Sequence, residues 1–161
     1  KLTVPYPSSE EEFQIVKTGG NADTIPVEKL LSASTLKKCR AAVDAVTADD
    51  KIIQYIVSLV SVTRPDLQKK NTEKQFASSG RHNDIFHYIS YGASPRAGIA
   101  LLKCAKVNAL FAGRSFVLPE DVQACAHAVM RHRLVLSYEA AADGVTADDL
   151  ISKIIELMPV P

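Results

Sequence analysis

The sequence predicts a mainly α-helical domain, a helical bundle with one short strand at its N-terminal end. Several segments repeat apolar residues at three- and four-residue spacing, which is typical of helices that bury one face. Ser, Thr and Asp precede these segments, and Pro or Gly follows them, as expected at helix ends. Only Leu2–Val4 favours a strand, which Pro5 would interrupt. With 161 residues, 47% of them hydrophobic, the chain is long enough for one well-packed domain.

The first half of the chain contains three predicted helices. Ser9 and Glu12 have the spacing of a capping box and predict a short helix. A second helix is expected over residues 34–46. Thr47 is the expected cap of a third helix, which Pro65 ends. This third helix is apolar on more than one face, so we expect it to run through the core.

Three further helices are predicted in the second half. One begins at Ser94 and ends at Gly113, one begins at Pro119, and one is capped by Thr146 and Asp149. The positions expected to face the core are Ile99, Leu102, Ala105, Ala109 and Leu110, then Val122, Cys125, Ala126, Val129 and Met130, and finally Leu150, Ile151, Ile154, Leu157 and Met158.

Residues 67–88 are polar and show neither helical nor strand periodicity, which predicts a long polar loop. Its basic residues could contact nucleic acid or a protein partner, but a solvated loop is the favoured interpretation. His82 and His87 have no Cys or carboxylate neighbours at ligand spacing, so no metal site is expected.

Charge and cysteine usage exclude several classes of protein. The 19 Lys and Arg residues nearly balance 18 Asp and Glu residues, and the net charge of +1 gives no field for nucleic acid or an anionic membrane. No apolar run approaches the ~18 residues of a membrane span, and no signal pattern opens the chain. The three widely spaced cysteines form neither a disulfide framework nor a CxxC site. We therefore expect a cytoplasmic protein.

Arg96 is the most informative charged residue, because it lies in the first turn of the helix that Ser94 and Pro95 begin. Free N–H groups and the helix dipole already make this end positive, so a cation here is unfavourable until an anion binds. Helix starts of this kind suit phosphate, and arginine adds a planar pair of donors. The alternative, that Arg96 pairs with a carboxylate elsewhere or points into water, remains open at this stage.

Residues Tyr91–Ala97 resemble the sensor-2 motif of MoxR-type AAA+ ATPases. Three other segments, Tyr6–Glu12, Ser61–Pro65 and Pro119–Val145, resemble the same family in the same order. The resemblance implies that Arg96 contacts the γ-phosphate of a nucleotide, with Ser94, Pro95 and Ala97 forming the rest of the motif. Leu118 lies where relatives commonly have a threonine cap, which implies a weaker start for the helix after it.

The resemblance covers only the C-terminal part of such an ATPase. It implies that residues 1–20 end the AAA+ core and lead into the lid, and that residues 21–161 form the lid domain. The seven glycines include no phosphate-binding loop, so we expect no catalytic residue in this chain and no ATP hydrolysis by it alone. ATP and Mg²⁺ belong to the parent protein and are not expected on this chain. Lys1, in place of methionine, suggests a chain cut from a longer one.

The resemblance also implies a function and partners. The lid would couple ATP hydrolysis to chaperone-like remodelling or maturation of other proteins. Its partners would be its own AAA+ core, the neighbouring subunits of a ring that we expect to be hexameric, and a von Willebrand factor A domain protein. Arg96 could serve its own subunit's nucleotide or its neighbour's.

Arg131, His132 and Arg133 are candidates for a contact with nucleotide or with a neighbouring subunit. They are expected in the last turn of the helix that begins at Pro119, and the competing interpretation is a favourable interaction with the negative end of that helix. For the whole chain, a helical nucleic-acid-binding module or a protein adaptor that never meets ATP are the alternative functions.

Overall fold

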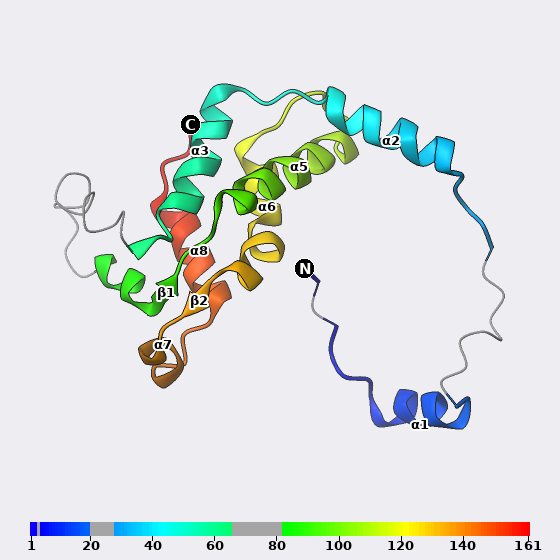
Figure 1. The fold of residues 1–161 in the computed structure, drawn as a ribbon, viewed down its shortest axis with the longest axis horizontal. Coiled ribbons are helices and arrows are strands. Elements are labelled where there is room, and N and C mark those ends of the chain that lie inside the picture. The colour runs from blue at the N-terminus through cyan, green and yellow to red at the C-terminus, as the bar shows by residue number, and fades with distance from the viewer. Residues whose placement is uncertain (3, 20–27, 66–81) are drawn as a thin grey trace. The chain divides into compact units, whose positions relative to one another are not determined.

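The computed structural model describes residues 1–2, 4–19, 28–65 and 82–161, and in these it is predominantly helical. The chain divides into two compact units, Leu2–Cys39 and Arg40–Pro161, with Lys1 grouped with the second. Figure 1 draws the elements along the chain. The mainly α-helical prediction is confirmed.

The unit Leu2–Cys39 contains α1 (Ser9–Lys17) and the first part of α2 (Ala33–Ala45), and α1 buries none of its residues. The capping box is formed by Ser8 and Glu11, one residue before the predicted pair. Consecutive serines and glutamates satisfy the spacing in both registers, so the sequence pattern alone did not distinguish them.

The predicted N-terminal strand is not found in the described residues. Leu2 and Val4 lie outside regular structure and are exposed, and residue 3 is outside the described part. The small sheet of this protein is instead formed by β1 (Ile89–Tyr91) and β2 (Val135–Leu136), which pair antiparallel. A strand needs a partner, and a short N-terminal segment carries no local signal of whether it has one.

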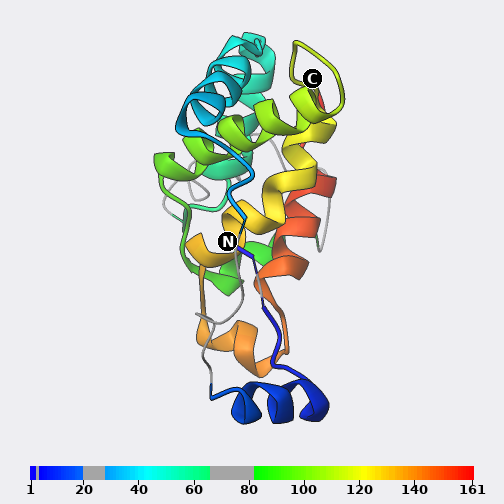
Figure 2. The same ribbon diagram turned by 90° about the vertical axis from the view of Figure 1, so that its right-hand side faces the viewer.

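The unit Arg40–Pro161 has its core between α3 (Asp50–Ser61), α5 (Pro95–Phe111), α6 (Pro119–Met130) and α8 (Ala147–Leu157). Helix α5 packs against both α3 and α6, and α6 packs against α8, as both ribbon views show (Figures 1 and 2). The 3₁₀ turn η3 (Arg131–Arg133) links α6 to β2, and the short helix α7 (Tyr138–Ala142) follows β2.

Helix α5 faces the core with residues spaced by four, which agrees only in part with the predicted stripe. Its buried residues are Ala97, Leu101, Ala105 and Ala109, of which Ala105 and Ala109 were predicted. Leu102 and Leu110 are partly buried against the core, whereas Ile99 is 57% exposed. The three alanines let neighbouring helices approach closely, and Leu101 fills the remaining space. Full burial of such a leucine contributes about 1.5–3 kcal/mol.

Helix α3 was predicted to run through the core, but it is amphipathic and packs against the core with one face. It buries Ile52, Tyr55, Ile56, Leu59 and Val60, and it leaves the apolar Ile53 and Val57 exposed on the other side. In contrast, the buried residues of α6 are the predicted stripe together with Asp121. Those of α8 are Leu150, Ile151 and Ile154, with Met158 buried just beyond the helix.

Thr47 was predicted to cap α3, but Asp49 does so by accepting a hydrogen bond from the Lys51 amide at 2.9 Å. Thr47 instead connects distant parts of the chain: its amide donates to Ser115 O at 2.9 Å, and its carbonyl accepts from the Val117 amide at 3.0 Å. The connection before α3 is thereby held against the connection before α6.

Most of the predicted polar loop lies outside the described residues, which resume at residue 82. The part that is described, His82–Tyr88, forms the 3₁₀ helix η2 and leads directly into β1.

Candidate functional site

The candidate site is the start of helix α5. Ser94 has extended backbone angles (φ −82°, ψ 168°), and Pro95 occupies the first helical turn, as predicted. The Ser94 side chain makes no capping hydrogen bond, although its carbonyl accepts one from the Ala97 amide at 2.8 Å. The positive helix end therefore keeps donor capacity in its first turn.

Arg96 is exposed, and none of the described residues forms a hydrogen bond or ion pair with its side chain. Ser94 and Pro95 are also exposed, so these three residues lie together on the surface. Ala97 differs, because it is fully buried in the helical core. Its methyl group packs inside the domain, away from the exposed surface that Ser94, Pro95 and Arg96 share.

The segment before this helix is attached to the end of α3. Thr63 is fully buried, and its hydroxyl donates to Val60 O at 2.6 Å and accepts from the Ala93 amide at 2.9 Å. Arg64, the next residue, donates from Nε to Ala93 O at 2.9 Å. Gly92 allows this approach, because a Cβ there would lie 2.3 Å from Thr63 O. We call Thr63, Arg64, Gly92 and Ala93 the clasp.

The predicted basic cluster is the 3₁₀ turn η3, after α6. Arg131 Nε lies 2.8 Å from Asp148 Oδ1, and this carboxylate raises the pKa of Arg131. Arg133 donates to Val129 O in the last turn of α6, which agrees with the helix-end interpretation. His132 is exposed, and partial desolvation, followed by the positive charge of Arg133, lowers its pKa. Two of the three residues therefore contact neighbouring elements of their own domain.

Comparisons with known proteins show which domain and which proteins this chain is similar to. Residues 85–154, which contain the start of α5 and all of α6, match the family described as the AAA lid domain. The whole chain is 30% identical to the chaperone MoxR1 of Mycobacterium tuberculosis and spans 40% of that protein. Residues 85–154 thus match an AAA lid domain. The chain as a whole is similar to the MoxR-type AAA+ proteins.

Two further relatives agree with this assignment. The protein MoxR of Methylorubrum extorquens is 39% identical over 75 residues, which are 45% of this chain and 22% of that one. A crystal structure of a proposed ATPase from Cytophaga hutchinsonii superposes with a TM-score of 0.70 at 31% identity, covering 98% of this chain and 45% of that one. The chain thus spans less than half the length of the relatives it matches.

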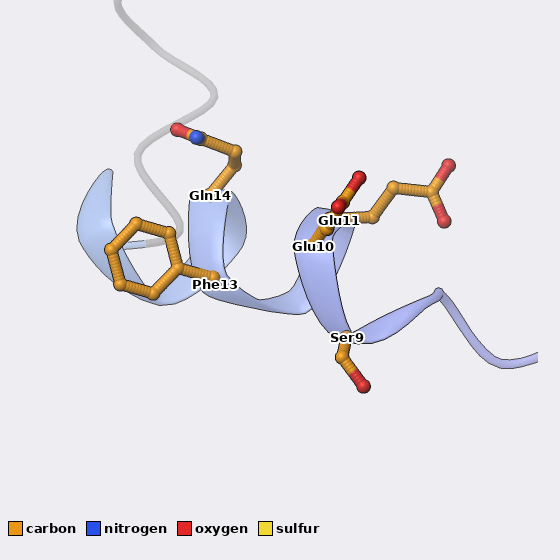
Figure 3. Close-up of a pocket in the computed structure, with 5 residues that line it drawn as sticks. All are labelled: Ser9, Glu10, Glu11, Phe13 and Gln14. Atoms are coloured by element: carbon orange, nitrogen blue, oxygen red, sulfur yellow. The ribbon is translucent and has the colours of Figure 1, made fainter.

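Other features of the described residues do not form a second site. The described residues contain no cluster of three or more His, Cys, Asp or Glu side chains that could hold a metal ion. None of the helices in the described ranges is long and apolar enough to cross a membrane. A shallow depression on α1 is lined by Ser9, Glu10, Glu11, Phe13 and Gln14 (Figure 3). These side chains come from one exposed helix, so the depression has no opposing wall from another element.

Two groups important to the lid were missed in the sequence. Thr63 was noted only as part of a family segment, and nothing local indicated that its hydroxyl would meet Ala93, 30 residues later. Asp121 was missed as the residue that secures the start of α6. Its carboxylate accepts from the Leu118 amide at 2.8 Å, which compensates for the absent threonine cap. An acidic residue three positions after the expected cap was the available signal.

Proposed function

We propose that this lid senses nucleotide bound by an AAA+ core, with Arg96 reaching the terminal phosphate. The observation that carries the proposal is the state of Arg96, which is exposed in the first turn of α5 and has no partner among the described residues. The side chain of the cap residue, Ser94, makes no capping hydrogen bond. The site fits an anion, since helix donors and the guanidinium both favour negative charge.

The fit concerns the terminal phosphate alone. The sequence has no glycine-rich phosphate loop, and the described residues offer no cluster of acidic side chains for Mg²⁺. The remaining phosphates, the metal ion and the attacking water would be held by the core, and this chain by itself would not hydrolyse ATP. Bound ATP supplies the phosphoryl group that is transferred to water.

Arg96 would form a charge-assisted hydrogen bond only while the terminal phosphate is present. Loss of that bond would release the start of α5. Because the clasp attaches this start to the end of α3, both helices would shift together with respect to the core. Such a movement would couple hydrolysis to remodelling of a client protein in a ring of subunits. The relative from M. tuberculosis is named a chaperone, which supports this proposal. A von Willebrand factor A domain protein would be the co-acting partner.

The test uses the longer protein that contains this lid together with an AAA+ core. Arg96→Ala should slow ATP hydrolysis by about a hundredfold or more, in line with arginine contacts in other phosphoryl-transfer enzymes. Arg96→Lys should restore activity only in part, because an ammonium lacks the paired donors. Lys103→Ala removes another exposed cation of the same helix and should leave hydrolysis unchanged. Equal rates for the wild-type and Arg96→Ala proteins would refute the proposal.

A further inference from the structure

We infer that Thr63 is a positioning residue for Arg96, which it orients through the Ala93 backbone. This inference rests on the proposed function of Arg96 and adds a second residue to it. The two side chains belong to segments that are distant in sequence, one at the end of α3 and one in the first turn of α5.

The hydroxyl of Thr63 both donates and accepts a hydrogen bond, and the residue is 0% exposed. The hydroxyl donates its proton to Val60 O at 2.6 Å and accepts a hydrogen bond from the Ala93 amide at 2.9 Å. Ala93 is itself 1% exposed, so its amide has no access to solvent as an alternative partner. A side chain of the same shape without oxygen would therefore leave a buried N–H group unpaired.

The other contacts of the clasp restrict Ala93 further. Arg64 Nε holds its carbonyl at 2.9 Å, so both polar groups of this one peptide residue bind to consecutive residues of the α3 end. Gly92 permits the contact, since any side chain would collide with the Thr63 carbonyl. Ala93 thus has little freedom to shift or rotate.

Arg96 follows Ala93 by three residues, through Ser94 and the conformationally restricted Pro95. Its side chain has no partner among the described residues, so its placement depends on the backbone that carries it. Holding Ala93 therefore determines where the guanidinium is presented. In phosphoryl transfer a displacement of about 1 Å can cost about a hundredfold in rate.

The first test uses this chain and compares Thr63→Val, which keeps the shape, with Thr63→Ser, which keeps the hydroxyl. Thr63→Val should speed hydrogen exchange of the Ala93 amide by about tenfold and shift the Arg96 amide resonance. Thr63→Ser should leave both close to wild type. Ile154→Val, a comparably mild core change in α8, should reduce stability without either effect. Unchanged exchange at Ala93 in Thr63→Val would overturn the inference.

The second test measures ATP turnover in the longer protein with its core. Thr63→Val should lower kcat by about tenfold and leave KM for ATP nearly unchanged, whereas Thr63→Ser should restore kcat. In an Arg96→Ala background, Thr63→Val should cause no additional loss, because the residue it positions is absent. An equal additional loss there would show a general structural role and overturn the inference.

The two tests distinguish two kinds of failure. If Arg96→Ala alone leaves turnover unchanged, the proposed function is refuted, whatever the exchange measurements show. If Arg96→Ala abolishes turnover but Thr63→Val has no effect on kcat, the sensor proposal stands and the positioning role of Thr63 is refuted.

Discussion

Arg114 and Asp121 form a bidentate ion pair across the turn between α5 and α6. Arg114 Nη1 lies 2.8 Å from Asp121 Oδ2, and Nη2 lies 2.6 Å from Oδ1. Asp121 is buried, and it also accepts the Leu118 amide at the start of α6. The pair therefore joins the end of α5 to the beginning of α6, which packs against it.

Replacement of Asp121 by asparagine should destabilise the domain by about 1–3 kcal/mol, because the Arg114 guanidinium and the Leu118 amide lose a buried, charged acceptor. Urea unfolding followed by circular dichroism measures the change. The matched control is Asp148→Asn, which removes a similar ion pair with Arg131 at a more exposed position. This control should cost clearly less. Equal losses in the two variants would contradict a special role for burial.

Stability should fall on acidification, and Asp121 should account for part of the decrease. The hydrogen bonds from Arg114 hold the pKa of Asp121 below its ordinary 3.8. A carboxyl whose pKa is lowered on folding contributes stability above the ordinary pKa and loses it as the pH falls through the folded-state value. The contribution is thus complete at neutral pH and is lost progressively below about pH 4.

In Asp121→Asn, the free energy of unfolding should change less steeply with pH over this acidic range. Some dependence should remain, because hydrogen bonding to Thr146 also lowers the pKa of Asp149. Urea titrations of both proteins at a series of acidic pH values measure the slopes. If the free energy of unfolding had the same pH dependence in both proteins, Asp121 would not be responsible for the loss of stability in acid.

Two glycines close to the site should respond oppositely to alanine. Gly92→Ala should destabilise by about 1–3 kcal/mol or more, because the new Cβ would lie 2.3 Å from Thr63 O. Gly98→Ala should stabilise by about 0.5–1 kcal/mol, since its Cβ would meet Ile56 at an ordinary 3.5 Å within a helix. Thermal unfolding of the two variants checks both signs. A tolerated alanine at position 92 would contradict the clasp geometry.

The cysteines should differ sharply in reactivity. Burial raises the pKa of the Cys125 thiol to about 12, and its Sγ also donates to Val122 O at 3.3 Å. Cys39 is exposed. A thiol reagent at pH 8 should therefore modify Cys39 quickly and Cys125 only after unfolding, because the thiolate is the reactive form. Mass spectrometry of the labelled peptides gives the order, and rapid labelling of Cys125 in the folded chain would contradict it.

Much of the fold could be predicted because the signals that begin and end a helix come from residues that are neighbours in the sequence. Pro95 and Pro119 begin helices as expected, and Thr146 forms the predicted capping box with Asp149. The errors at helix starts have two different causes. Ser8 and Ser9 offered two equally good capping registers, which is a local ambiguity. Thr47 is a good cap by residue type, but it forms a long-range contact with Ser115 instead.

Buried faces were harder to predict, because periodicity shows which residues could be buried and not which neighbours cover them. Ile99 fits the apolar spacing of α5 but is exposed, whereas Leu101 is fully buried. The alanine spacing of α5 decides this, since it selects the face on which other helices approach most closely.

The sequence by itself determined the helical class, the family segments and the place of Arg96 in the first turn of a helix. All of these depend on residues within a few positions of one another. Only the tertiary structure decided how the backbone before that arginine is held, because Thr63 contacts Ala93 across 30 residues of sequence. The hydrogen-bond partners of a hydroxyl cannot be predicted from sequence spacing. This contact is therefore known only from the packing of α3 against α5, which brings the two segments together.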